Sequence, residues 1–325
     1  MIATGKPVVA VDLGGTKIAA GLVSRSGDIS HRERALTLAV EGPAPVMERL
    51  FAVIEAVLNQ AKLKPADTAG ICAAAASPID MNTGMVTNAP NLPGWEAIPL
   101  RKIIKEKYGV DAFLINDAKA AALGEHEFGA GKGINNLICI TLGTGIGGGI
   151  ITGGGLYLGQ SGAAGEVGHM TVDVNGPKCV CGNVGCWELF ASGTAMEGEA
   201  ARRLAGGEKS SLRTLFEAGG HQVKAEQIAE AARQSDRLAL SVIEWSANHI
   251  GTGLVNLANI FNPELIVVGG GLIKIGALLL EPAFKAVKQR TFPVISRAVR
   301  VVPSKIGDDA AILGAAAFAF NEGKV

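Results

Sequence analysis

Three of the five cysteines and one histidine lie close together in a polar, glycine-rich segment. They are His169, Cys179, Cys181 and Cys186. Thiolate sulfur and imidazole nitrogen are the ligands that Zn²⁺ prefers, and a structural zinc takes four of them in a tetrahedron. Gly182 and Gly185 let the chain turn tightly enough for three sulfurs to reach one point. The segment therefore predicts a structural zinc site.

Two other interpretations of these cysteines stay open. A cysteine is often a small buried apolar residue, and a disulfide can form outside a reducing compartment. The spacing C-x-C-x₄-C, with a histidine ten residues before the first cysteine, is not that of a standard zinc finger. A polar, glycine-rich loop fits a core poorly, so we favour zinc. Cys72 and Cys139 lie in apolar, strand-like runs and are expected in the core.

Carboxylates occur beside this cluster and at one strand end. Glu166 and Glu188 bracket the cysteines, so a loop held by a metal would also hold a polar ligand nearby. Asn116 and Asp117 follow an expected strand and precede an expected helix. Ligands bind at such strand ends, and a carboxylate there can accept a proton from a hydroxyl that attacks phosphorus. The alternative role for Asp117 is helix capping.

Three glycine-rich turns each follow an expected strand. They comprise Gly14, Gly15, Thr16 and Lys17; then Gly143, Thr144, Gly145, Gly147 and Gly148; and last Gly269, Gly270 and Gly271. Backbone N–H groups in such turns form anion sites. We expect the first two turns to hold a polyphosphate between them, with Asp12 binding Mg²⁺ through water, and the third to admit a nucleoside. An ordinary hairpin turn is the alternative for either of the first two.

The second turn also matches the dinucleotide-binding pattern G-x-G-x-x-G. That pattern requires a helix after the glycines, whereas the strand-like residues 149–152 follow here. A nicotinamide-dependent dehydrogenase is therefore disfavoured. In the loop expected at 77–95, Asn88 and Asn91 could bind hydroxyl groups or serve only as turn residues. Residues 125–127 (Glu-His-Glu) are expected on a solvated helix surface.

Composition excludes several classes of protein. The 325 residues carry a formal net charge of zero, are 48% apolar and are only 5% aromatic, so nucleic acid is not expected as a partner. The charge-free stretch 133–165 is long enough to span a membrane, but it is crowded with glycine, which is poor inside helices. We expect a protein without a signal peptide that resides in the cytoplasm and does not bind membranes.

Strands alternate with helices along the chain, which predicts an α/β fold. The strands are expected at 8–11, 18–23, 68–75, 112–115, 137–141, 149–152 and 265–268, and the helices at 45–62, 100–108, 118–128, 194–204, 225–233, 236–261 and 309–321. VAVDLGGT and ICITLGTG align, which indicates an internal duplication, although two glycine turns can match by chance. We expect one domain at 1–115 plus 304–325 and a second at 116–303.

The motifs in their order resemble the ROK family (repressors, open reading frames, kinases). They are DLGGTK, NLPGW, NDA, LGTGIGGG, EVGHM, CVCGNVGCWE and VVGGGL, and they cover nearly the whole chain. The resemblance implies the two-domain actin-like fold of sugar kinases and Hsp70 ATPases, with duplicated mixed sheets and an interdomain cleft. It implies that Asp117 is the general base on a sugar 6-hydroxyl. It also implies that Asn91, Asn116, Asp117, Glu166, His169 and Glu188 bind the sugar, and that the four residues named above are the zinc ligands.

Within the family, GEVGHM, CGNVGCWELFASG and GEHEFGAGKG look most like the glucokinase branch. The resemblance then implies an ATP:hexose 6-phosphotransferase that uses Mg²⁺-ATP and glucose, and the family leads us to expect a homodimer. ROK repressors carry an N-terminal DNA-binding module, for which a strand starting at Val8 leaves no room. Alternatives are a kinase for N-acetylglucosamine, N-acetylmannosamine, fructose or allose, or a non-catalytic sugar sensor. Residues 75–80 (AASPID) replace the usual P-G-P turn, which leaves the hexose open.

Overall fold

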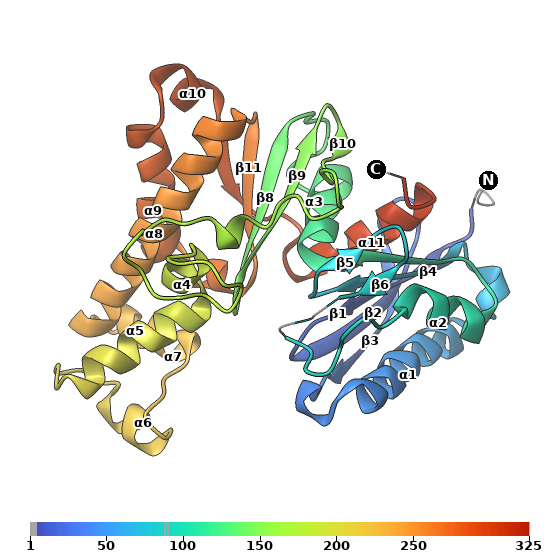
Figure 1. Cartoon of the computed structure of the whole chain (residues 1–325), viewed down its shortest axis with the longest axis horizontal. Coiled ribbons are helices and arrows are strands. Elements are labelled where there is room, and N and C mark those ends of the chain that lie inside the picture. Colours follow the sequence, from blue (N-terminus) through green and yellow to red (C-terminus); the bar gives the residue numbers. More distant parts are fainter. Residues whose placement is uncertain (1–4, 88, 90, 325) are drawn as a thin grey trace. The chain divides into compact units, whose positions relative to one another are not determined.

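The computed structural model describes residues 5–87, 89 and 91–324, and it contains two compact units (Figure 1). One unit comprises the chain up to Cys139, Gly149–Gly165 and the chain from Ser304 onward; the other comprises Ile140–Gly148 and Glu166–Pro303. The expected second domain, 116–303, differs from this division over 116–139 and 149–165, and the return to the first domain at Ser304 coincides with it. The expected domain limits stay a prediction.

A mixed five-stranded sheet forms the centre of the first unit. Its strands are β1 (Val8–Leu13), β2 (Lys17–Val23), β3 (Ile29–Leu36), β4 (Gly70–Ala75) and β7 (Ala112–Asn116), in the order β3-β2-β1-β4-β7. β1, β4 and β7 run parallel, whereas β2 and β3 are antiparallel to their neighbours. Alternate residues of β1, such as Val9 and Val11, enter one fully buried core because side chains of a strand alternate between faces.

Helices cover both faces of this sheet. They are α1 (Pro43–Ala61), α2 (Leu100–Tyr108), α3 (Asp117–Phe128) and α11 (Ala310–Phe320). α1 buries an apolar stripe that includes Leu50, Val53 and Ile54, spaced as one face of a helix, into the same core as Val9. α11 packs on β1, β4 and α3. Two glycines make that approach close, because a Cβ at Gly124 or Gly314 would meet backbone atoms of the facing helix.

A second five-stranded sheet repeats this arrangement. Its strands are β8 (Leu137–Leu142), β9 (Ile146–Thr152), β10 (Gly155–Leu156), β11 (Leu265–Gly269) and β12 (Arg300–Pro303), in the order β10-β9-β8-β11-β12. When the five strands of each sheet are numbered by their order in the chain, both sheets have the spatial order 3-2-1-4-5. The duplicated mixed sheets expected from the two aligned glycine motifs are therefore confirmed.

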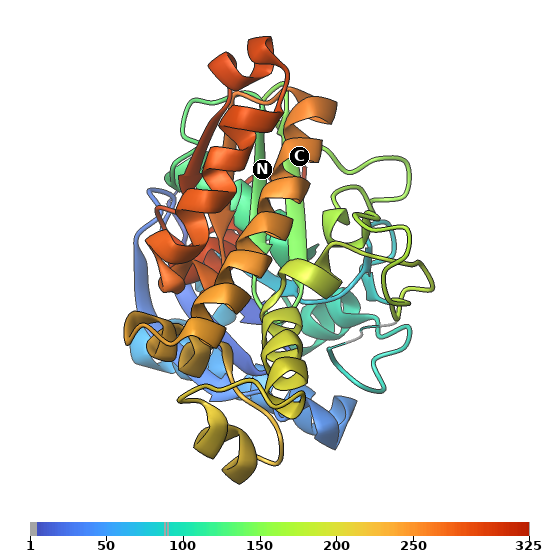
Figure 2. The same ribbon diagram turned by 90° about the vertical axis from the view of Figure 1, so that its left-hand side faces the viewer.

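Helices predominate in the second unit, which contains β11, β12 and residues 140–148 of the β8–β9 hairpin from this sheet (Figure 2). They are α4 (Glu188–Ala191), α5 (Gly193–Ala205), α6 (Arg213–Ala218), α7 (Ala225–Arg233), α8 (Arg237–Phe261), α9 (Ala277–Arg290) and α10 (Pro293–Ala298). The long helix α8 packs along α9 and also contacts α4, α5 and α7. Among the described residues, none of the helices combines the length and the apolar character that crossing a bilayer requires.

Several elements lie where sequence patterns gave no signal. β3 is an edge strand with a mostly exposed, charged sequence, so it lacks the apolar alternation of a half-buried strand. α9 contains Pro282 in its interior, a residue that normally interrupts helices. The loop expected at 77–95 contains a two-stranded hairpin, β5 (Ile79–Asp80) with β6 (Met85–Val86). β9 begins at Ile146, so the second glycine turn is shorter than expected.

Candidate active site and metal centre

The carboxyl ends of three parallel strands bring most of the first unit's candidate residues to one edge of its sheet. In the strand register, Leu13 of β1 pairs with Ala75 of β4, which in turn pairs with Asn116 of β7. The turn DLGGTK, the segment AASPID and the pair Asn116-Asp117 therefore leave the sheet along one line. Ligands of open α/β sheets bind beyond such strand ends.

Asn116 both caps α3 and holds the carboxylate of Asp117. Its Oδ1 accepts hydrogen bonds from the N–H groups of Ala118 and Lys119, each at 3.1 Å. Its Nδ2 donates to Oδ1 of Asp117 at 3.0 Å and to the carbonyl of Ser77 at 3.2 Å. The alternative role of Asp117 as the helix cap is wrong, because Asn116 is the cap and Asp117 is the first helical residue.

The half-buried Asp117 is the first residue of α3 and accepts a backbone hydrogen bond. Its Oδ1 accepts a hydrogen bond from the N–H of Ala118 at 2.8 Å. The N-terminal end of a helix carries a partial positive charge, which stabilises a carboxylate there. A carboxylate held in place at a strand end is the group that a general base requires.

The DLGGTK turn is held from two sides. A Cβ at Gly15 would lie 2.8 Å from the carbonyl oxygen of Asn91, so only glycine lets the exposed Asn91 loop come this close. Thr37, a fully buried residue, donates its hydroxyl to the carbonyl of Gly14 at 2.7 Å and its N–H to that of Thr16 at 2.9 Å. Sequence patterns gave no signal for Thr37, because Thr37 follows β3 whereas its hydrogen-bond partners lie in the turn between β1 and β2. Asn88 lies outside the described residues.

Asp12, the first residue of the DLGGTK motif, still belongs to β1 and precedes the glycines of the turn. Burial raises its pKa to about 6, an effect that Lys17 opposes and Asp308 reinforces. A cation nearby stabilises the charged form of such a carboxylate, and the expected contact of Asp12 with Mg²⁺ through water stays a prediction.

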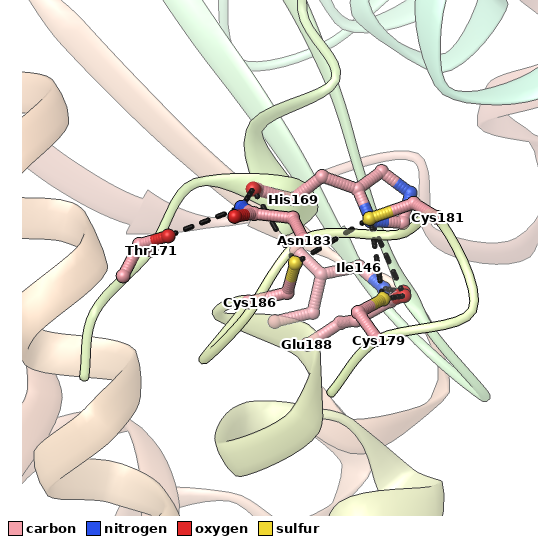
Figure 3. Close-up of polar contacts among 8 residues, drawn as sticks. All are labelled: Ile146, His169, Thr171, Cys179, Cys181, Asn183, Cys186 and Glu188. Carbon is pink, nitrogen blue, oxygen red and sulfur yellow. Dashed lines mark hydrogen bonds and ion pairs between the residues drawn. The ribbon is translucent and has the colours of Figure 1, made fainter. Parts of the chain in front are cut away.

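The four expected zinc ligands converge in the second unit (Figure 3). The donor atoms of His169, Cys179, Cys181 and Cys186 all lie within 4.8 Å of one another. The sulfurs of Cys181 and Cys186 are 3.6 Å apart, and that of Cys179 is 3.7 Å from Nδ1 of His169. Tetrahedral zinc separates two thiolates by about 3.8 Å and a thiolate from an imidazole nitrogen by about 3.5 Å. The donor set and its spacing fit zinc.

The loop around these ligands is shaped by its own backbone. Gly182 and Gly185 have positive φ angles of 94° and 65°, and a Cβ at Gly185 would overlap the carbonyl of Asp173. The side chain of Asn183 donates to the carbonyl of His169 and to the hydroxyl of Thr171, both at 3.0 Å. All five cysteines are free of disulfides, and Cys72 and Cys139 are buried as expected. The disulfide interpretation is therefore wrong.

The protonation of these thiols also bears on metal binding. A backbone hydrogen bond from Asn183 lowers the pKa of Cys181, whereas burial raises the pKa of Cys186 to about 12. Zinc binds thiolates, so metal binding would release protons from this cluster.

Glu188 joins the metal cluster to the second glycine turn. One carboxylate oxygen lies 3.5 Å from Nδ1 of His169, and the other accepts a hydrogen bond from the N–H of Ile146 at 3.5 Å. A Cβ at Gly145 would lie 2.8 Å from the latter oxygen, so glycine makes room for the carboxylate. Glu166 is exposed and starts the short 3-10 helix that carries His169, whose N–H donates to the carbonyl of Glu166.

The second and third glycine turns both belong to the second unit, where they lie together at the ends of β8 and β11. A Cβ at Gly270 would overlap the backbone of Leu142, whereas a Cβ at Gly143 or Gly271 would meet no atom within 4 Å. Gly143 also accepts, through its carbonyl, the N–H of Gly193 at the start of α5, at 2.8 Å. The turns thus offer open backbone beside a helix N-terminus, as an anion site requires.

Glu125 is fully buried, so its expected place on a solvated helix surface is wrong. Its Oε1 accepts hydrogen bonds from the hydroxyl of Ser304 and from the N–H groups of Lys305 and Ile306. Its Oε2 accepts the N–H of Ala130 at 2.8 Å. Local sequence gives no sign of this role, because all the donors except Ala130 come from a segment far along the chain. Glu127 is exposed, as expected.

The sequence pattern of the ROK family matches residues 8–322. The chain belongs to the ROK family. It is 38% identical over 312 residues to a protein named glucokinase from Thermotoga maritima, which covers 95% of this chain and 96% of that protein. It is also 35% identical over 326 residues to a protein named putative xylose repressor from a Caldicellulosiruptor species, covering 97% of this chain and 78% of that protein.

Solved structures of the ROK family share the fold. A ROK family glucokinase from Streptomyces griseus, in complex with glucose and AMPPNP, superposes with a TM-score of 0.83 at 34% identity, covering 97% of this chain and 99% of that one. The family resemblance and the expected sugar-kinase fold class are therefore confirmed. The ROK family contains proteins named as kinases and proteins named as repressors, so function depends on the residues described above.

Proposed function

We propose that this ROK protein is an ATP-dependent hexose kinase that phosphorylates the 6-hydroxyl of glucose. The observation that carries the proposal is the carboxylate of Asp117, held by Asn116 and Ala118 at the sheet edge from which DLGGTK also emerges. The likeness along nearly the whole chain to proteins named glucokinase, one of them bound to glucose and AMPPNP, supports the choice of sugar and nucleotide.

In the proposed reaction Asp117 accepts the proton of the sugar 6-hydroxyl. The oxygen then forms a bond to the γ-phosphorus of ATP while the bond from that phosphorus to the β–γ bridging oxygen breaks, so that ADP leaves. The proton ends on the carboxylate of Asp117. Asn91 and Asn116 are assigned to the sugar, and Asn116 also keeps the Asp117 carboxylate in place.

In the second unit we assign Glu166, His169 and Glu188 to the sugar hydroxyls. Nδ1 of His169 faces the sulfur of Cys179, which leaves Nε2 to donate an N–H to a sugar oxygen. His169, Cys179, Cys181 and Cys186 would hold zinc. The metal would supply no catalytic step; it would brace the loop on which Glu188 stands.

The nucleotide is assigned to the glycine turns and their neighbours. These are Asp12 with Gly14, Gly15, Thr16 and Lys17, then Gly143, Thr144 and Gly145, and last Gly269, Gly270 and Gly271. Backbone N–H groups would bind phosphate oxygens, and the exposed Lys17 would add a positive charge. Mg²⁺ bound with ATP would offset phosphate charge, and Asp12 would contact it through water.

Steady-state assays that couple ADP release to a dye test the proposal. Glucose, fructose, allose, N-acetylglucosamine and N-acetylmannosamine are each offered with Mg²⁺-ATP, and glucose is expected to give the highest kcat/KM. A higher value for another sugar would keep the kinase and replace its substrate, which the unusual segment 75–80 makes worth testing. Tight glucose binding without any ADP release would identify a non-catalytic sensor instead.

Two broader properties stay predictions from the family resemblance. A homodimer in the cytoplasm is expected, with neither nucleic acid nor membrane as a partner. Light scattering of the purified protein at several concentrations would give its mass in solution, and fractionation of cells would give its location.

A further inference from the structure

Trp187 lies between the last zinc ligand and Glu188 and is fully buried against α8. Its indole Nε1 donates a hydrogen bond to the carbonyl of His249 on α8 at 2.8 Å. Its N–H donates to the carbonyl of Met170, the residue after His169, at 2.9 Å. The backbone of Trp187 thus joins the two ends of the zinc loop, and its side chain ties them and the start of α4 to α8.

Gly253 provides the slot in α8 that receives this indole. A Cβ at position 253 would overlap the six-membered ring of Trp187. Glycine inside a helix is less favourable than alanine. Helix propensity therefore does not explain Gly253 in the middle of α8, whereas the seat of Trp187 does.

A second aromatic contact fixes the other end of α4. The ring of Phe190 stacks on that of His249, with centroids 4.9 Å apart and planes 17° from parallel. Nδ1 of His249 bonds the carbonyl of Trp245 at 2.8 Å, which holds the imidazole along the helix. α4 is only four residues long, so its position depends on these contacts with α8 rather than on its own hydrogen bonds.

We infer that Gly253 and Trp187 together form a positioning element for the sugar site, acting through Glu188. The inference rests on the proposed function, in which Glu188 binds a sugar hydroxyl. The position of the indole sets the start of α4, and the start of α4 sets the distance between the Glu188 carboxylate and its ligand. Neither residue touches the reacting atoms, so the effect should fall on sugar affinity.

The test is the variant Gly253→Ala, which places a methyl group where the indole lies. KM for glucose is expected to rise about tenfold, because shifts near 1 Å in a binding group have large effects, while KM for ATP changes by less than about twofold. The zinc content, measured by mass spectrometry of the metal, is expected to stay at that of the wild type. A merely structural defect would instead raise both KM values together and lower the zinc content.

Gly251→Ala is the matched control on the same helix. A Cβ at Gly251 would lie 2.7 Å from the Cβ of Ala286 on α9, so this variant disturbs α8 away from Trp187. Its thermal midpoint is expected to fall, with KM for glucose within about twofold of the wild type.

A double variant tests whether the two residues act as a pair. Trp187→Leu removes the indole and leaves space, so the added methyl of Gly253→Ala should do less harm in that background. The rise in KM for glucose in the double variant is expected to be at least about threefold smaller than the product of the single effects.

The outcomes separate this inference from the proposed function. A wild-type protein without ATP-dependent glucose phosphorylation would overturn the proposed function, and this inference with it. If the wild type is active, an unchanged KM for glucose in folded Gly253→Ala overturns the inference alone. Equal rises of both KM values, loss of zinc, or strictly multiplicative effects in the double variant also overturn it.

Discussion

The Asn116–Asp117 junction and the His169–Glu188 loop both carry residues assigned to the sugar, yet different forces hold them. The junction stands at the end of β7, whose register with β4 sets its place, and a side-chain cap completes it. The loop contains little regular structure, only isolated bridges such as Thr171 with Cys186, and four metal-binding side chains at its centre.

The difference separates two ways of ordering a polar site. Backbone hydrogen bonds and an apolar core order the junction without help from a ligand. The loop brings three thiols and an imidazole together, and thiols this close are stable as thiolates only when a cation neutralises them. We therefore expect the junction to keep its geometry without metal and the loop to lose it.

The largest expected effect tests the chemistry of the junction. Asp117→Asn should lower kcat by about 10²–10⁴, because an amide cannot accept the hydroxyl proton. Glucose binding, measured by calorimetry, and zinc content should stay close to those of the wild type. Full activity in this variant would remove Asp117 from the role of base.

The next effect tests how firmly the other end of α3 is fixed. Glu125→Ala should lower the free energy of unfolding by about 2–4 kcal/mol, because it removes a fully buried carboxylate that accepts the N–H groups of Lys305, Ile306 and Ala130. Urea titration measures the change. Glu127→Ala is the control, since that side chain is exposed, and it should stay within about 0.5 kcal/mol of the wild type.

A smaller effect tests the dependence of the loop on metal. Cys181→Ser should lose zinc and raise KM for glucose by about tenfold or more, with KM for ATP less affected, because Glu188 loses its support. Val180→Ser, at the exposed neighbouring position, should retain zinc and an unchanged KM. A zinc-free variant with normal KM for glucose would contradict the contrast drawn between the two regions.

The smallest effect tests the contact between Glu188 and the second glycine turn. Gly145→Ala places a Cβ 2.8 Å from a Glu188 oxygen and should raise KM for glucose about threefold, since the carboxylate can shift part of the way. Gly143→Ala meets no atom within 4 Å and serves as the control for this contact. Equal KM values for glucose in the two variants would show that the Glu188 contact has no effect on sugar binding.

Local patterns in the chain were sufficient for much of the fold and of the site. Apolar periodicity predicted α1, α2 and α8 closely, and the repeated glycine motif predicted the duplicated sheets. Residue types and spacing predicted the convergence of the four metal-binding side chains. Each of these signals lies within a short segment, or within two short segments for the glycine motif, so it can be recognised without knowing how the chain folds.

Contacts between distant segments decided the rest. The sequence could not separate Asn116 from Asp117 as the cap of α3, nor show that Thr37 holds the DLGGTK turn. Glu125 looked like a surface residue because most of its hydrogen-bond donors lie about 180 positions away. The reason for glycine at position 253 becomes apparent only from its contact with Trp187. Burial and hydrogen-bond partners of this kind depend on how the chain folds back on itself, which only the tertiary structure determines.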